Sequence, residues 1–273
     1  MARVHGILLL ILVIATPATA ARARLLLRFP SPPAVGNLLW IAAHPDDELL
    51  VAPLLELFCR ERGARCTIAV ATRGERGSCE LPSCGPDMGQ LREQELRASA
   101  TRFAAAVVVG SFPDGSSWSP DEVLLAWRAK IPTVETFIDS LLDDIRPDMV
   151  LTLDPRHGST CHPDHRAIGR AVVASASKRG VPVGVLRSKA AIVGPWDAVV
   201  IDPNLDSVAF VVDGGRSSID GSPLWDALVD VARAHASQFS PRAVQALEGV
   251  PLHQRLLGIE LLTALPPTDQ CMP

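Results

Sequence analysis

The chain has 273 residues, of which 48% are hydrophobic, 4% are aromatic and none is tyrosine. This length and apolar content suit one large α/β domain with a well-buried core. The formal net charge is −4, and no block of Lys or Arg offers a surface for a phosphate backbone, so we expect no nucleic-acid partner.

Residues 1–20 are typical of a secretory signal peptide. Arg3 precedes an apolar run, Ile7–Ala15, and a segment of small residues, Ala18–Ala20, follows it. The run is short for a membrane-spanning helix, which needs about 20 apolar residues. We therefore expect cleavage after Ala20 and a secreted or periplasmic protein.

The alternative is an uncleaved membrane anchor. Arg22, Arg24 and Arg28 lie just after the apolar run and outnumber Arg3 before it. If the run spanned a bilayer, the positive-inside rule would keep the rest of the chain in the cytosol, attached to the membrane. Membrane association is expected only in that case.

A linker is predicted at residues 21–36, which are rich in Arg and Pro. No later segment has the composition of a linker between domains. Residues 37–265 are therefore predicted to form a single domain, and residues 266–273 a short tail. The sequence leaves the oligomeric state open.

Short apolar runs alternate with segments of helical period along this domain. The predicted strands are 37–43, 67–72, 107–110 and 149–153. The predicted helices are 47–62, 90–106, 121–145, 163–179 and 224–238. Pro132 must break or kink the third of these helices, because its nitrogen carries no hydrogen. Two apolar runs, 190–201 and 208–212, predict an antiparallel extension.

The alternation of strand and helix predicts an α/β fold with a mostly parallel sheet and helices on both faces. Ligands of such sheets bind beyond the carboxyl ends of the strands. His44 directly follows the first predicted strand, and the cluster His162–His165 follows the strand 149–153 by one loop. Both are therefore expected at the same edge of the sheet, in one site.

Two polar clusters offer ligands for a catalytic metal. The first is His44-Pro45-Asp46-Asp47-Glu48 and the second is His162-Pro163-Asp164-His165. Zinc in hydrolases takes three protein ligands, often histidine and carboxylate, and keeps an open position for water. Sites of this kind also accept Fe2+ or Co2+.

The residue types suggest a role for each side chain. We expect His44, Asp47 and His165 to bind the metal. Asp46 is then the general base that takes a proton from water, and His162 stabilises an oxyanion or protonates a leaving amine. The alternative is that the carboxylates of both clusters only favour helix N-termini through the helix dipole.

With these clusters the chain resembles the PIG-L deacetylase family, also called LmbE-like. Ala43–Glu48 and His162–His165 carry the resemblance, and looser matches follow at Thr72–Gly77, Phe112–Gly115 and Ala234–Gln238. The resemblance implies a Rossmann-like sheet. It also implies zinc-dependent removal of an acetyl group from a small-molecule amino-sugar conjugate that contains N-acetylglucosamine.

The resemblance also implies roles by position. The family's metal ligands, catalytic aspartate and second histidine fall on the residues assigned to these roles above. Asp164 would orient His162 from behind. Arg92, in a segment similar to the family's Arg-x-x-Glu, would contact a substrate oxygen, and the alternative is a solvated helix charge. His235 and Gln238 would support the site or cap a helix.

The cysteines favour an oxidising compartment only weakly. Cys79 and Cys84 are spaced for a small disulfide-closed loop, whereas Cys59 and Cys66 lie in apolar segments and are expected to be buried free thiols. The remaining two cysteines have no evident partner. The loop 78–87 and the lack of tyrosine depart from the family pattern, so the exact substrate stays open.

Three other side chains draw separate expectations. His157 lies in the loop before His162 and is expected at the rim of the site. Trp118 is expected either to stack on a sugar ring or to fill the core. Trp40, inside the first predicted strand, is expected to pack in the core.

Two other functions remain open beside deacetylation. The chain could be an N-acyl amidase that acts on a lipid or a secondary-metabolite amino sugar, or a secreted module that binds glycans without cleaving them. A nucleotide-binding protein is disfavoured, because no Gly-x-Gly-x-x-Gly follows the first predicted strand.

Overall fold

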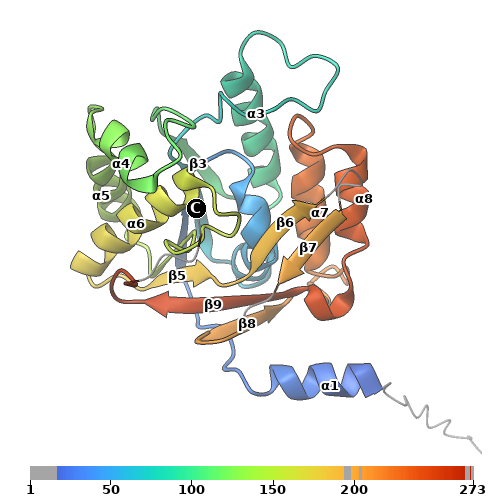
Figure 1. Ribbon diagram of the computed structural model, residues 1–273. Helices are drawn as coiled ribbons and strands as arrows, with labels where there is room; N and C mark the ends of the chain where they lie inside the picture. The colour runs from blue at the N-terminus through green and yellow to red at the C-terminus, as the bar shows by residue number, and fades with distance from the viewer. Residues whose placement is uncertain (1–16, 194–197, 203–204, 268–270, 272–273) are drawn as a thin grey trace, which may run out of the picture.

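The structure, a computed structural model, describes residues 17–193, 198–202, 205–267 and 271. A seven-stranded sheet lies at the centre of the domain, with helices on both sides (Figure 1). Its strands are β1 (Asn37–Ala42), β2 (Arg65–Val70), β3 (Ala106–Val109), β4 (Met149–Thr152), β5 (Val183–Leu186), β8 (Phe210–Asp213) and β9 (Leu256–Leu262). Across the sheet they lie in the order β3-β2-β1-β4-β5-β9-β8.

The strands from β3 to β5 are parallel, and β9 and β8 add an antiparallel edge. β1 lies between β2 and β4, and every residue from Leu38 to Ala42 is fully buried. An unbroken apolar run is what a strand covered by helices on both faces requires. The prediction of a mostly parallel sheet with helices on both faces is confirmed.

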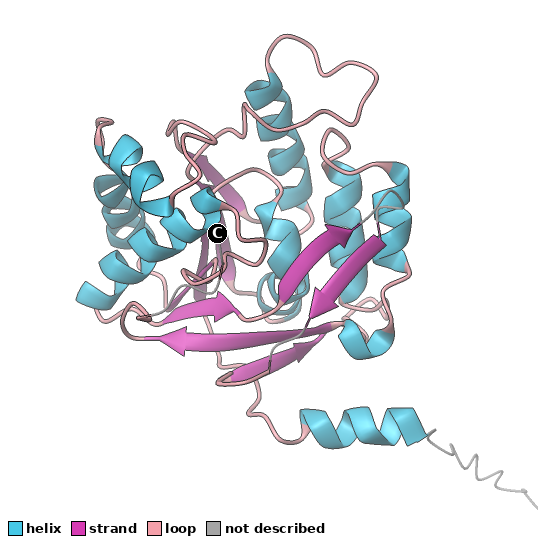
Figure 2. Cartoon of the chain, viewed as in Figure 1, coloured by secondary structure: helices cyan, strands magenta, loops and turns pink. Residues whose placement is uncertain are grey.

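The helices lie in two groups on opposite sides of the sheet (Figures 1 and 2). One group is α4 (Pro120–Arg128), α5 (Val134–Ile145) and α6 (Pro163–Lys178). The other is α3 (Met88–Thr101), α7 (Trp225–Ala234) and α8 (Pro241–Glu248). α6 packs against β1, β4 and β5, and α3 packs against β3 and α7. Pro132 separates α4 from α5, as predicted.

The segment 47–62 is not the single helix that its apolar spacing predicts. It contains a 3₁₀ turn, Asp47–Val51, a short α-helix, α2 (Ala52–Leu55), and a π-helical turn, Glu56–Glu61. Pro53 explains the first interruption, because its nitrogen cannot donate the hydrogen bond that a continuous α-helix would need. The tight first turn brings the Asp47 side chain back to the end of β1.

The apolar runs 190–201 and 208–212 fall on antiparallel strands, as predicted. β8 and β9 extend the main sheet, while β6 (Lys189–Val193) and β7 (Ala198–Asp202) pair separately. The sequence prediction lacks β5, β9 and α8. α8 had a local signal, because a Ser-Pro pair is a frequent helix start, and the Ser240 hydroxyl accepts the Ala243 N–H.

The helix α1 (Pro17–Leu26) projects from the domain (Figure 1). The predicted cleavage position after Ala20 falls inside it, so the predicted linker begins as a helix. Residues 1–16, the basic and apolar parts of the predicted signal peptide, lie outside the described residues. Arg22 of α1 forms an ion pair with Asp213 at the end of β8. Within the described ranges, each helix is too short or too polar to cross a membrane.

Disulfides pair all of the cysteines. The predicted small loop closed by Cys79 and Cys84 is confirmed. The expectation of free thiols at Cys59 and Cys66 is wrong, because the chain reverses between the π-helical turn and β2 and brings their Cα atoms to 5.8 Å. That separation is ordinary for a disulfide.

The third disulfide joins Cys161 to Cys271, 110 positions apart. It fastens the predicted tail to the loop directly before His162. Neither cysteine lies near the other in sequence, so only the folded chain could reveal the pair.

Replacing both Cys59 and Cys66 by alanine should lower the free energy of unfolding by about 2–3 kcal/mol, because the closed loop no longer restricts the unfolded chain. Chemical denaturation without reductant measures the change. An unchanged free energy of unfolding, with two reactive thiols in the denatured wild type, would show that this disulfide does not form.

Candidate functional site

Two histidines meet at the carboxyl ends of neighbouring parallel strands. β1 and β4 pair in register from Leu38 with Met149 to Ile41 with Thr152, so both strands end at the same edge. His44 follows β1 by two residues, and His165 lies in the first turn of α6. Their side chains are buried, and His44 Nδ1 lies 3.1 Å from His165 Nε2.

The hydrogen bonds on the far side of each ring fix which nitrogens carry hydrogen. His44 Nε2 lies 3.1 Å from Asp114 Oδ1 and 3.2 Å from Asp164 Oδ2. His165 Nδ1 lies 2.9 Å from the carbonyl oxygen of Gly158. Carboxylate and carbonyl oxygens only accept, so these ring nitrogens donate. In the neutral rings, each of the two facing nitrogens therefore carries a lone pair. The two lone pairs repel each other unless a proton or a metal ion lies between them.

Asp47 supplies the third donor. Its Oδ2 accepts the N–H groups of Ala43 and His44 at 3.0 and 2.8 Å, while Oδ1 lies 2.9 Å from His165 Nε2. Asp47 Oδ2 is 3.7 Å from His44 Nδ1. Donors around a tetrahedral zinc ion with bonds of about 2.0–2.1 Å are roughly 3.3 Å apart. The three side chains are close enough to share such an ion, with a different oxygen of Asp47 nearest to each ring.

A second group of possible ligands uses the opposite nitrogen of His44. The ligand atoms of His44, Asp114 and Asp164 lie within 4.8 Å of one another. A backbone N–H donates to one oxygen of each carboxylate, from Arg76 to Asp114 Oδ2 at 2.8 Å and from Gly115 to Asp164 Oδ2 at 2.9 Å. Asp164 is fully buried, so a substrate could not reach an ion there. This group orients His44 instead.

The charges around His44 favour a cation. Burial lowers the pKa of His44, but its contacts with Asp114, Asp164 and Asp47 outweigh burial and raise it well above 6.5. Burial raises the pKa of Asp47, but His165 and His44 hold it well below its usual value. The surroundings of the two rings therefore favour a positive charge, which a proton or a metal ion can supply.

Asp46 stands beside this group in a strained conformation. Its φ is 109°, a value that non-glycine residues rarely adopt. Its N–H donates to Glu48 Oε2 at 3.1 Å, and its Oδ2 accepts from Arg92 Nη2 at 2.7 Å. Burial raises the pKa of Asp46 and outweighs the opposing charge of Arg92. The carboxylate is thus fixed in place and more basic than usual.

Arg92 is buried, so the alternative of a solvated helix charge is wrong. Its Nη1 donates to Gly74 O at 2.8 Å, and its Nη2 donates to Pro45 O at 2.6 Å as well as to Asp46. Arg92 therefore holds the loop that carries Asp46. The guanidinium also lines the cavity, and its contact with a substrate oxygen stays a prediction.

A second layer of side chains supports Asp46. Glu48 is fully buried, and its Oε1 accepts from His235 Nε2 at 2.6 Å and from the Ser99 hydroxyl. Burial lowers the pKa of His235, but Glu48 outweighs burial and raises it. His235 thus acts from behind the site. Gln238 instead holds the loop that contains Ser78, because its side-chain amide donates to Ser78 O at 2.9 Å.

His162 is the N-cap of α6. Its Nδ1 accepts the Asp164 N–H at 3.2 Å, so Nε2 carries the hydrogen in the neutral ring. Burial and the neighbouring His165 and His44 lower the pKa of His162 to about 4. The ring is therefore a neutral hydrogen-bond donor at pH 7. Asp164 reaches it through the backbone N–H, while its carboxylate faces His44.

His157 lies beneath the site, and the expectation that it sits at the rim is wrong. Its side chain is fully buried, with Nε2 3.2 Å from Asp154 Oδ2. Its Nδ1 accepts the Ser159 N–H at 2.9 Å. These contacts hold the loop between β4 and α6, so His157 shapes the segment that delivers His162.

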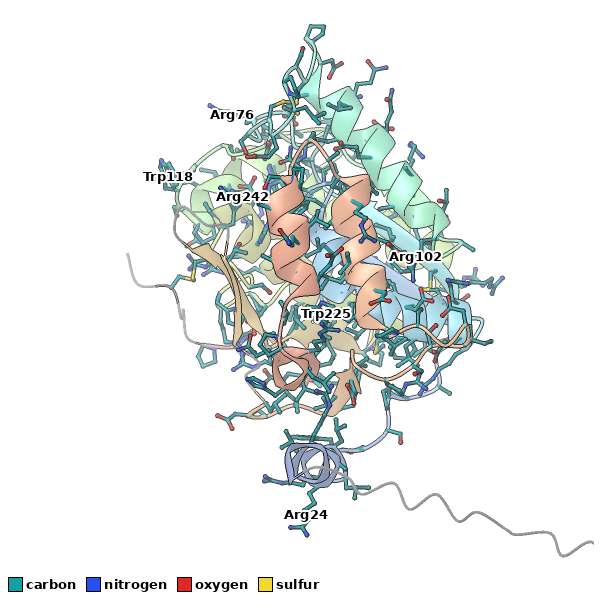
Figure 3. All side chains as sticks on the ribbon, turned by 90° about the vertical axis from the view of Figure 1, so that its right-hand side faces the viewer. Arg24, Arg76, Arg102, Trp118, Trp225 and Arg242 are labelled. Carbon is teal, nitrogen blue, oxygen red and sulfur yellow. A yellow bond between two sulfur atoms is a disulfide. The ribbon has the colours of Figure 1, made fainter. Side chains whose placement is uncertain are left out.

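A cavity of about 660 Å³ opens over these groups. The cavity is lined by His44, Asp46, Asp47, Arg92, His162 and His165. Trp118 is 96% exposed and projects outward from the loop after β3 (Figure 3), so it does not fill the core. Its stacking on a sugar stays a prediction. Trp40 is fully buried, as expected.

Comparison with known families identifies the architecture. The family model described as PIG-L, GlcNAc-PI de-N-acetylase, matches residues 39–176, which contain both polar clusters. The chain belongs to the PIG-L family. This membership confirms the resemblance noted from the sequence.

Several known proteins are similar to this PIG-L protein. The 1D-myo-inositol 2-acetamido-2-deoxy-alpha-D-glucopyranoside deacetylase of Acidothermus cellulolyticus is 25% identical over 260 residues, 83% of this chain and 87% of that one. The N,N'-diacetylchitobiose deacetylase from Pyrococcus horikoshii superposes with a TM-score of 0.60 at 17% identity, over 94% of this chain and 97% of that chain. The A40926 pseudoaglycone deacetylase Dbv21 gives 0.56 at 18%, over 82% and 97%. The PIG-L protein therefore has the LmbE-like fold.

Sequence reasoning missed the support around the PIG-L site more than the site itself. Asp114 received no role, although a carboxylate in a turn after the third strand belongs to the same sheet edge. Its pKa falls to about 2, because the hydrogen bond and charge of His44 outweigh burial. Glu48 was considered only as a residue that favours a helix start. The structure reveals these roles through the contact of Asp114 with His44 and the contact of Glu48 with His235. In each pair the two residues are far apart in the sequence.

The low pKa of His162 predicts a pH effect on stability. Unfolded His162 binds its proton near 6.5 and the folded residue near 4. Between these values the unfolded state holds more protons, so stability falls as the pH falls. From pH 7 to pH 5, metal-free His162→Gln should therefore lose about 1–2 kcal/mol less stability than metal-free wild type. Denaturant titrations measure both losses, and equal losses would contradict the low pKa.

Proposed function

We propose that this PIG-L protein is a zinc-dependent hydrolase that removes the N-acetyl group from a substrate containing N-acetylglucosamine. The observation that carries the proposal is the convergence of His44, Asp47 and His165 at the wall of a cavity that also exposes Asp46. Family membership supports it, and so do the named relatives, each of which is a deacetylase.

Proton transfer is the work of Asp46. A zinc ion held by the three donors would supply a Lewis acid that activates water and polarises the amide carbonyl. Asp46 accepts the proton of the attacking water, because its buried carboxylate has a raised pKa and Arg92 fixes its direction. It then returns this proton to the departing amine. Water and the amide thus become acetate and a free amine.

Charge stabilisation is the work of His162. As the carbonyl carbon becomes tetrahedral, its oxygen gains negative charge, and His162 Nε2–H donates a hydrogen bond to it. The N-cap bond from the Asp164 N–H fixes this tautomer. Because the pKa of His162 is about 4, the ring acts as a donor rather than as an acid at neutral pH.

The acyl group proposed for the substrate is acetyl. The named relatives are deacetylases of an inositol 2-acetamido-2-deoxy-glucopyranoside, of N,N'-diacetylchitobiose and of the A40926 pseudoaglycone. The partner proposed here is likewise a small-molecule amino-sugar conjugate. The donor set would also accept Fe2+ or Co2+ in place of zinc.

We also propose that the protein is exported. Disulfides persist in oxidising compartments and are rare in the cytosol, and every cysteine of this chain is in one. The segment 1–20, typical of a signal peptide, supports the same location. A membrane anchor with a cytosolic domain is the alternative, which the disulfides disfavour.

The purified protein should bind one zinc ion per chain, and His165→Ala should lose it. The variant should lose more activity than the roughly 10–100-fold that loss of a residue orienting a ligand costs. Elemental analysis and acetate release measure the two effects. His253→Ala, at an exposed histidine, is the matched control. Full zinc in His165→Ala would contradict the ligand assignment.

Asp46→Asn should keep the zinc but reduce turnover by roughly 10²–10⁴-fold, because amide nitrogen and oxygen cannot accept the proton. Acetate release from N-acetylglucosamine conjugates measures the rate, with exposed Asp144→Asn as control. Deacetylation at the wild-type rate would refute the assigned base. Wild-type protein that binds such conjugates without releasing acetate would instead favour a glycan-binding module.

A further inference from the structure

The loop between β4 and α6, residues 153–162, contains backbone conformations that need support from outside the loop. Ser159 and Cys161 have φ values of 63° and 62°, which residues with a side chain rarely adopt. Gly158, just before them, has a φ of 55°. Strained residues persist only where the surrounding structure holds them. Since the loop ends at His162, the contacts that hold the loop also place this ring.

Buried charges hold the start of this loop. Asp154 is fully buried, and its carboxylate accepts from Arg156 Nε at 2.8 Å and from Arg187 Nη1 at 2.7 Å. Both arginines also form ion pairs with Glu260 of β9. Hydrogen bonds between ionised groups are stronger than those between neutral groups. The first part of the loop is therefore fastened to the antiparallel edge of the sheet.

A disulfide holds the end of the loop. Cys161 directly precedes His162, the N-cap of α6, and its sulfur is bonded to the sulfur of Cys271, beyond β9. Within the loop, the Cys161 N–H donates to His157 O at 2.6 Å. A covalent bond to a distant part of the chain therefore restricts the backbone at the position next to the His162 ring.

We propose that the disulfide between Cys161 and Cys271 positions His162 for the reaction, in addition to stabilising the fold. This inference rests on the proposed deacetylase function, in which His162 Nε2–H donates a hydrogen bond to the developing oxyanion. Misplacing a reacting group by about 1 Å can cost about 100-fold in rate. The disulfide acts through His162, so it is a positioning element and not a catalytic group.

The three zinc donors have anchors outside the end of the loop. Hydrogen bonds hold His44 and Asp47 next to β1. His165 lies in α6, which packs against β1, β4 and β5. Its Nδ1 contacts Gly158 O, and the Gly158 N–H is bonded to Asp154 O at 2.7 Å, in the part of the loop that buried charges hold. Loss of the disulfide should therefore lower turnover while the zinc stays bound.

The test replaces both cysteines, Cys161→Ala with Cys271→Ala, in the zinc-loaded protein. At a temperature where variant and wild type are folded, kcat for acetate release from N-acetylglucosamine conjugates should fall by about 10–100-fold, with KM near that of wild type. The matched control is Cys59→Ala with Cys66→Ala, which removes a disulfide between residues that do not line the cavity. It should leave kcat near that of wild type. An unchanged kcat in the first variant overturns the proposal.

A double-mutant cycle separates positioning from a general effect on the fold. If the disulfide acts through His162, its removal should lower kcat no further in the His162→Ala protein, because residues that act as a unit have non-additive effects. An equal fold-loss of kcat with and without His162 would show that the disulfide acts on another group, and would overturn the proposal.

If the variant without Cys161 and Cys271 does not fold, reduction of the folded wild type replaces it. Tris(2-carboxyethyl)phosphine takes up the oxygen of water to become the phosphine oxide, and the disulfide takes up the two hydrogens to become two thiols. Cys161 is exposed, so the reagent reaches it. Activity should fall at the rate at which alkylated Cys161 appears in peptide mass spectra. Constant activity, or a fall that follows Cys59 or Cys79 instead, overturns the proposal.

Hydrogen exchange separates this inference from the proposed function. The Asp164 N–H donates to His162 Nδ1 at 3.2 Å, so its exchange rate reports the position of the ring. Without the disulfide, this N–H should exchange about 2–30-fold faster, the factor that corresponds to loss of an N-cap hydrogen bond. If the wild type releases no acetate from any conjugate, the proposed function fails. Faster exchange at Asp164 would even then support the positioning of His162, and equal exchange would overturn it.

Discussion

His44 Nδ1 and His165 Nε2 face each other at 3.1 Å, each with its lone pair toward the other. This contact constrains the side chains that surround the two rings. Each ring is held by a hydrogen bond on its opposite nitrogen, so neither can turn away. The two nitrogens repel each other when nothing lies between them, and both attract a cation that lies there. Buried carboxylates reinforce this preference, because Asp47 and Asp114 are both held ionised at neutral pH.

The charged and the apolar lining of the cavity come largely from different parts of the chain. The family match, 39–176, contains most of β1, the parallel strands β2, β3 and β4, and the charged residues that line the cavity. Much of the apolar lining of the cavity comes from later elements, α7, α8 and β9. Parallel strands place the polar loops that carry His44 and His165 at one sheet edge. The charged side chains of the cavity thus lie within the family match, and much of its apolar lining lies after it.

The sequence predicted features that depend on residues near one another in the chain. It did not predict features that depend on contacts between distant segments. Apolar runs and turns located the parallel strands β1 to β4 but not β5, and both histidine clusters stood out because each follows a strand. Pro53 disrupted a helix that spacing alone supported. The bond between Cys161 and Cys271 and the burial of His157 depend on segments that meet only in the folded chain. The family resemblance pointed to Arg92, but only the structure shows its hydrogen bond to Asp46.

Anomalous diffraction at the zinc edge from crystals of the zinc-loaded protein tests the metal site most directly. One peak should lie within about 2.0–2.2 Å of His44 Nδ1, His165 Nε2 and a carboxylate oxygen of Asp47. A peak on the other side of the ring, between His44 Nε2, Asp114 and Asp164, would contradict this arrangement, and so would rings of His44 and His165 that share no ion.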